Sequence, residues 1–107
     1  MNLELLPNEI LLDLFEYLNG VDIFHGFYGL NSRFNLLLYK QFQIYSFQFD
    51  SISKYKFDII CQQHLPLIAN RVIDLSLSDD DDTPEQINLF VSYISSMHVN
   101  NFVISLV

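Results

Sequence analysis

Apolar residues recur at helical spacing through the first forty positions of the chain. Between residues 5 and 41, Glu9, Asp13 and Glu16 follow each other at spacings of four and three and mark one polar stripe. Apolar residues cover the rest of this first helix, an arc wider than packing against one neighbour requires. Pro7 fits the first helical position, where its missing amide hydrogen carries no penalty. The pattern therefore predicts a first helix with more apolar surface than its own fold needs.

Two further helices are predicted in the same segment. Asn19-Gly20 ends the first helix, and Asp22 can cap a second one, which runs from Ile23 to about Gly29. Internal glycines weaken that second helix, so it should be short or irregular. Asn31 or Ser32 can cap a third helix that runs towards residue 40.

After residue 42, apolar and polar residues alternate, which is typical of strands. The alternating or strand-like runs are residues 43–49, 71–78 and 102–107. A helix is predicted over 53–64, with Tyr55 or Phe57, Ile60 and Cys61 inward, and Leu65-Pro66 should end it. Thr83-Pro84-Glu85-Gln86 has the form of a capping box with proline at the first helical position. The helix that it opens should bury the apolar residues Ile87, Phe90, Val91 and Ile94.

This second half of the chain contains an internal repeat. Phe47-Gln48-Phe49-Asp50 is matched by Leu75-Ser76-Leu77-Ser78, and Asp74-Leu75 is matched in turn by Ser105-Leu106. A strand followed by a helix, repeated along the chain, is the unit of leucine-rich-repeat solenoids. Any small α/β segment can nevertheless imitate two such units. The repeat predicts three parallel strands that neighbour each other in chain order. The apolar last residues further suggest a protein that continues beyond residue 107.

The repeat also predicts which side chains share a face of the sheet, since residues two apart on a strand point the same way. One continuous apolar layer against the helices should contain Phe47, Phe49, Leu75, Leu77 and Leu106. The opposite, open surface should carry Gln48, Ser76 and Ser105.

The N-terminal segment resembles the F-box family over about residues 3 to 41. The matching residues are Leu6-Pro7-x-Glu9-Ile10-Leu11-x-x-Leu14-Phe15-x-x-Leu18, then Asp22-Ile23, then Leu30-Asn31-x-Arg33-Phe34. Many members have tryptophan beside a basic residue in the third helix, where this chain has Arg33-Phe34. The resemblance implies an α+β fold in two parts. A three-helix F-box spans residues 1–41, and strand–helix repeats with short parallel strands, the start of a leucine-rich-repeat-like solenoid, span residues 42–107.

The same resemblance implies a function. F-box proteins are substrate-recognition adaptors of cullin–RING (SCF-type) ubiquitin ligases and dock to a Skp-type adaptor protein, while a second region holds an unknown protein substrate. We therefore expect protein binding and neither an enzyme nor a cofactor. The residues expected to dock are Leu6, Pro7, Ile10, Leu14, Phe15, Leu18 and Ile23. An alternative is a Skp-independent scaffold or interaction protein whose N-terminal helices cap a solenoid. Exposure of the apolar arc would favour docking, whereas coverage by the solenoid would favour the cap.

Charge and cysteine content narrow the classes of partner. Thirteen acidic residues against five scattered basic ones give a net charge of −8 in 107 residues. No basic patch can follow a phosphate backbone, so we expect no nucleic acid and no membrane as a partner. The single cysteine fits a reducing compartment, and the sequence has neither a signal peptide nor an apolar run of membrane-spanning length. These features predict an intracellular protein, cytoplasmic or nuclear.

Two other candidate sites are weaker. The acidic run Asp79 to Asp82 could bind a cation, but it lacks the spacing of a known calcium loop and is better explained as a solvated turn. Cys61 and His64 share a helical face and could be half of a zinc site, yet no second pair has matching spacing. A reactive thiol would need an activated, exposed setting, whereas Ile59 and Ile60 precede Cys61.

Overall fold

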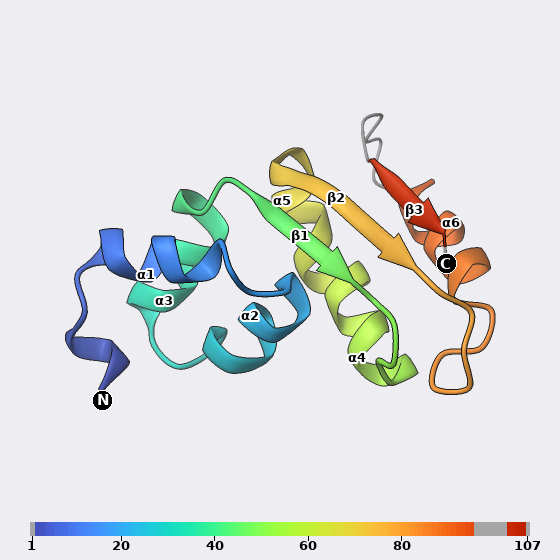
Figure 1. Cartoon of the computed structure of the whole chain (residues 1–107), viewed down its shortest axis with the longest axis horizontal. Helices are drawn as coiled ribbons and strands as arrows, with labels where there is room; N and C mark the ends of the chain where they lie inside the picture. Colours follow the sequence, from blue (N-terminus) through green and yellow to red (C-terminus); the bar gives the residue numbers. More distant parts are fainter. Residues whose placement is uncertain (1, 96–102, 107) are drawn as a thin grey trace.

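The N-terminal helices follow the apolar spacing of the sequence. In a computed structural model that describes residues 2–95 and 103–106, a 3-10 turn over Leu3–Leu5 precedes them. The helices are α1 (Asn8–Phe15), α2 (Gly20–Phe27) and α3 (Ser32–Leu36), the last of which continues as a π-helical turn over Leu37–Gln41. Figure 1 shows them at one end of an elongated molecule of 41 × 28 × 20 Å.

The starts of the three N-terminal helices agree with the prediction in one case and differ in two. The side chain of Asn31 accepts a hydrogen bond from the Phe34 amide and caps α3, as predicted. The prediction that Asp22 caps α2 is wrong, because the helix begins at Gly20 and the side chain of Asn19 accepts from the Val21 amide instead. Pro7 is extended and stands just before α1, one position earlier than predicted.

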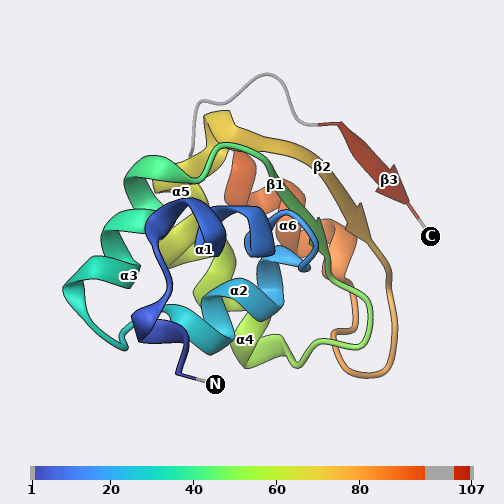
Figure 2. The same cartoon turned by 60° about the vertical axis from the view of Figure 1, so that its left-hand side comes forward.

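The three predicted strands form one parallel sheet. They are β1 (Tyr45–Gln48), β2 (Val72–Leu77) and β3 (Ile104–Leu106), and their order is β1-β2-β3. Residues 102 and 107 of the third predicted run lie outside the described residues. Parallel pairing in chain order confirms the prediction drawn from the repeat. Helices α4 (Lys54–Ile59), α5 (Leu65–Ile68) and α6 (Gln86–Ile94) lie on one side of this sheet (Figures 1 and 2).

The helical connection between β1 and β2 is longer than predicted. After α4 the chain forms a π-helical turn over Ile60–His64, then α5, and then a 3-10 turn over Ala69–Arg71. Leu65-Pro66 therefore does not end the helix, because Pro66 falls in the first turn of α5, where the missing amide hydrogen costs no hydrogen bond. Phe57, Ile60 and Cys61 are buried as predicted, whereas Tyr55 is exposed.

The predicted capping box before α6 does not form. The hydroxyl of Thr83 donates to the Ile52 carbonyl, and the side chain of Gln86 accepts from the Ser78 amide and donates to the Phe49 carbonyl. These polar groups tie the loop to the segments that follow β1 and β2 and are not available to the helix end.

Helix α6 therefore begins without the predicted cap. Glu85, with φ of 59°, precedes the helix and makes no side-chain capping bond. Of the four residues expected to face inward, Phe90 is buried, and Ile87 and Ile94 are half-buried. Val91 is exposed, contrary to the prediction.

The inner face of the sheet forms part of the core. Phe47, Phe49, Leu75 and Leu77 are all buried, and Phe47 pairs with Leu75, as the repeat predicted. The predicted layer does not extend to β3, because Leu106 is 64% exposed and pairs with Leu77 rather than with Leu75. On the opposite face, Gln48, Ser76 and Ser105 lie side by side in one row, as the alternation predicted.

The helical end of the molecule is joined to the free edge of β1. The side-chain amide of Asn19 donates to the Gln48 carbonyl at 2.9 Å and accepts from the Gln48 amide at 3.0 Å, in place of a neighbouring strand. Gly20 packs so closely on Phe47 that a β-carbon there would lie 2.5 Å from the ring. The Phe24 ring stacks on Tyr45 at 5.4 Å between centroids. The two predicted parts therefore share one core.

Candidate functional site

Three large apolar side chains of the first helical segment point away from the core. Ile10, Leu14 and Leu18 follow one another at intervals of four and are 45%, 40% and 38% exposed. Ile10 and Leu14 lie on the same side of α1, because residues four apart share a helix face, and Leu18 extends the row just beyond the helix end. Pro7 is also exposed at the start of this row, and Leu6 is half-buried. We call Leu6, Pro7, Ile10, Leu14 and Leu18 the α1 face.

Two of the predicted docking residues do not belong to this surface. Phe15 is 1% exposed, and its ring packs edge-on against Phe27 at 5.1 Å and Phe42 at 5.6 Å between centroids. Ile23 is completely buried. Their side chains serve the interior of the protein, and the candidate docking surface is therefore smaller than the set predicted from the sequence. An exposed residue missed by that set is Tyr17, which lies three positions after Leu14.

Arg33 fixes the segment that leads into α1. Its guanidinium donates from Nε to Asn8 Oδ1 at 2.8 Å, from Nη1 to the Glu4 carbonyl at 2.8 Å, and from Nη2 to the Leu6 carbonyl. Hydrogen bonds from a charged donor are among the stronger ones in proteins. Arg33 thereby holds the 3-10 turn and the start of α1 on α3, and it positions Leu6 and Pro7 of the α1 face.

The surroundings of the α1 face are acidic. Glu9, Asp13 and Glu16 are all exposed on the same segment, and α1 itself contains no basic residue. A partner that covers the apolar row would therefore meet negative charge at its margin. Charge at the rim of an interface affects the association rate and the choice of partner more than it affects affinity.

The acidic run uses its carboxylates within its own loop. Asp80 accepts hydrogen bonds from the Ser51, Thr83 and Asp82 amides, and these bonds hold the pKa of its carboxyl below the usual range. Asp79 accepts from the Ile87 amide at 3.0 Å, in the first turn of α6. Across residues 2–95 and 103–106, no group of three or more histidine, cysteine or acidic side chains converges on a metal-binding geometry.

Cys61 and His64 are both buried. Cys61 is 1% exposed, and burial raises the pKa of its thiol. Burial also lowers the pKa of His64 to about 4, so the imidazole is neutral at pH 7. Its Nδ1 lies 2.7 Å from the Tyr39 hydroxyl. A buried, protonated thiol lacks the setting of an activated nucleophile, and the neutral imidazole of His64 already has a partner in Tyr39.

Comparison with known proteins identified no relative. No family model matches the chain, and neither the curated proteins nor the solved structures include a significant match. Within the part of the chain that the structure describes, no helix combines the length and the apolar character needed to cross a bilayer.

Proposed function

We propose that this protein is a substrate-recognition adaptor of an SCF-type ubiquitin ligase and that it docks to a Skp-type adaptor protein through the α1 face. The observation that carries the proposal is the exposed row Ile10, Leu14 and Leu18. An apolar row on a helix is suited to a hydrophobic groove of a partner. The F-box-like sequence supports the identity of that partner, and the single buried cysteine fits a reducing compartment, cytoplasmic or nuclear.

The strand–helix region is proposed to hold the protein substrate. No helix of the described residues covers one face of its sheet, where Gln48, Ser76 and Ser105 form a polar row (Figure 2). Loops and open sheet surfaces on a rigid scaffold are common places for recognition. In this proposal the helical end of the molecule binds the Skp-type adaptor and the strand–helix end binds the substrate.

Calorimetric titration of the full chain with a purified Skp-type adaptor tests the docking proposal. We expect saturable binding of the wild type and at least a tenfold loss for Leu14→Asp, because a buried interface would then contain an unpaired charge. Val91→Asp is the matched control, since Val91 is also exposed but lies on α6. It should retain wild-type affinity. Absence of wild-type binding, or equal affinity for wild type and Leu14→Asp, would refute the proposal.

A second candidate is a Skp-independent scaffold whose N-terminal helices cap the sheet. The bonds of Asn19 to the Gln48 backbone favour it, because they occupy the β1 edge that a capping element must cover. Capping by Asn19 and α2 leaves the α1 face uncovered, so capping by itself does not prevent docking through that face. The titration separates them, since only the ligase adaptor binds the Skp-type protein.

A further inference from the structure

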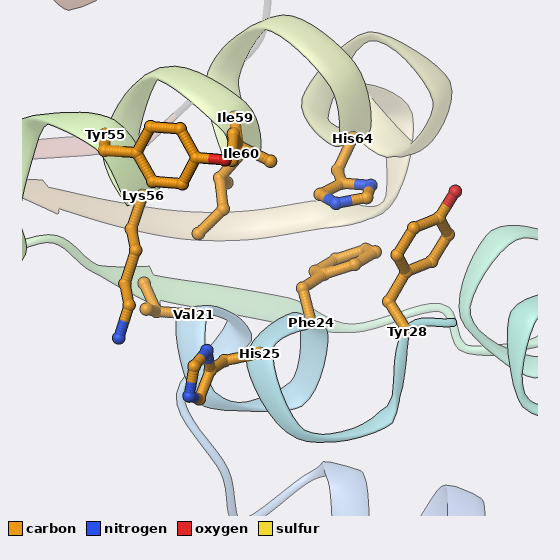
Figure 3. A pocket seen from close by; sticks show the side chains of 9 residues that line it. All are labelled: Val21, Phe24, His25, Tyr28, Tyr55, Lys56, Ile59, Ile60 and His64. Carbon is orange, nitrogen blue, oxygen red and sulfur yellow. The ribbon is translucent and has the colours of Figure 1, made fainter. Parts of the chain in front are cut away.

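A pocket of about 270 Å³ lies where the helical end meets the first strand–helix unit. On one side, α2 and the residue after it contribute Val21, Phe24 and Tyr28, as Figure 3 shows. On the other side, α4 and the π-helical turn contribute Tyr55 and Ile60 (Figure 3). Ligand sites for drug-sized molecules usually measure roughly 300–1,000 Å³. This pocket therefore lies close to the lower end of that range and has room for a single large side chain.

One polar atom in the pocket makes no hydrogen bond within the described chain. His64 lines the pocket and is 3% exposed, with its ring stacked on Phe24 at 4.3 Å and edge-on to Tyr28 at 4.5 Å between centroids. Tyr39 occupies Nδ1, while Nε2 makes no hydrogen bond to any described residue. No fully buried polar side-chain atom in the described structure is without a partner, so Nε2 of this pocket-lining residue is not fully buried. A ligand with a matching polar group would satisfy it.

Positive charge stands at the mouth of the pocket. Lys56 lines it together with His25 (Figure 3), and the Lys56 ammonium makes no ion pair in the described part of the chain, where Lys54 pairs with Asp58 at 2.7 Å. Lys56 also lines a neighbouring hollow with Asp22, Asp50 and Asp82, and none of these carboxylates is within ion-pair distance of it. An ammonium without an ion pair beside an apolar pocket offers a partner to a carboxylate of the ligand.

We propose that this pocket binds a tyrosine side chain in a peptide segment whose neighbouring residues are acidic. The aromatic walls Phe24, Tyr28 and Tyr55 match a flat ring, since aromatic pairs gain from offset and edge-on contacts. A phenol both donates and accepts a hydrogen bond, so it pairs with His64 Nε2 in either neutral tautomer. The further statement that such a peptide belongs to a ligase substrate rests on the proposed function. Binding of the peptide to the pocket does not depend on that function.

Fluorescence anisotropy with the full chain and labelled acetyl-Glu-Glu-Tyr-Glu-Glu peptides tests the proposal. The tyrosine peptide should bind saturably. Replacement of its tyrosine by alanine, or of its glutamates by lysine, should weaken binding at least tenfold. Replacement by phenylalanine should weaken it severalfold through the lost hydroxyl. No saturable binding, or equal affinity for the tyrosine and alanine peptides, would overturn the pocket assignment. Equal affinity for tyrosine and phenylalanine would overturn the hydrogen bond to His64.

Variants of exposed residues locate the binding without risk to the fold. Tyr55→Ala removes a wall residue that is 76% exposed and should weaken binding about tenfold, while Tyr17→Ala, an exposed tyrosine on the helical end, should not. Lys56→Glu should weaken binding of the acidic peptide more than Lys40→Glu does. Unchanged binding in Tyr55→Ala would contradict the site. Leu14→Asp should keep its peptide affinity, so failure of adaptor docking and failure of the pocket are distinguishable.

Discussion

The α1 face and the inner face of the sheet carry similar side chains in opposite situations. Ile10 and Leu14 are about half exposed, whereas Phe47 and Leu75 are completely buried. The sheet face is covered by helices of the same chain, which is why its apolar residues became core (Figure 2). Helix α1 already contributes Leu11 to the core from its other side. The exposed residues on the outer side of α1 are therefore not needed to pack this helix against the core.

Buried apolar residues stabilise the fold, whereas exposed apolar residues are free to bind a partner. A completely buried side chain has its stabilising contacts within the chain, and truncation removes them. A half-exposed side chain has contacts left to make. Stability measurements should therefore respond to substitutions in the sheet, and binding measurements should respond to substitutions on the α1 face.

The largest effect on stability should come from Phe47→Ala. This substitution leaves a cavity beneath the sheet and should lower the free energy of unfolding by about 3–5 kcal/mol. Leu14→Ala, the matched change on the α1 face, should cost less than about 1 kcal/mol. Urea unfolding followed by circular dichroism measures both. Similar losses at the two sites would mean that the α1 face is part of the core.

The second effect concerns His64, whose ring stacks on Phe24 of α2. Because burial lowers its folded pKa to about 4, below the unfolded value near 6.5, folding favours the neutral ring. Its contribution is fully present above pH 6.5 and is lost as the pH falls towards 4. The difference amounts to up to about 3 kcal/mol, since one pKa unit is worth about 1.4 kcal/mol.

His64→Phe isolates this contribution from that of the carboxylates, which titrate in the same acidic range. The variant loses the partner of Tyr39, a cost that does not depend on pH over this interval. Unfolding free energies at pH 4, 5, 6 and 7 should therefore fall more steeply for the wild type than for His64→Phe. Parallel curves for the two proteins would show that His64 is not desolvated.

The sequence predicted the elements well where the signal was local or repeated. Alternation together with the internal repeat predicts β1 and β2 and their parallel pairing, and Asn31 is one of the two caps predicted for α3. The capping box at Thr83 failed because Thr83 and Gln86 bond to distant backbone groups, which outweighs the local pattern. Local spacing cannot reveal such competition.

The candidate sites were predicted less completely, for a related reason. A helix that is apolar over a wide arc does not show which side faces inward, so Phe15 could not be distinguished from Leu14. The pocket had no signal at all in the sequence. Its walls come from residues 21–28 and 55–64, and only the packing of α2 against the strand–helix unit brings them together.

The last prediction tests that packing directly with two glycines of α2. At Gly20 a β-carbon would lie 2.5 Å from the buried Phe47 ring, so Gly20→Ala must displace the helix from the strand and should destabilise the protein by about 1–3 kcal/mol. At Gly26 a β-carbon meets nothing within 4 Å, and Gly26→Ala should stabilise the protein by about 0.5–1 kcal/mol through helix propensity. Thermal unfolding distinguishes the two signs. If Gly20→Ala were neutral or stabilising, α2 would not rest on β1, and the helical end would be a separate module rather than part of one core.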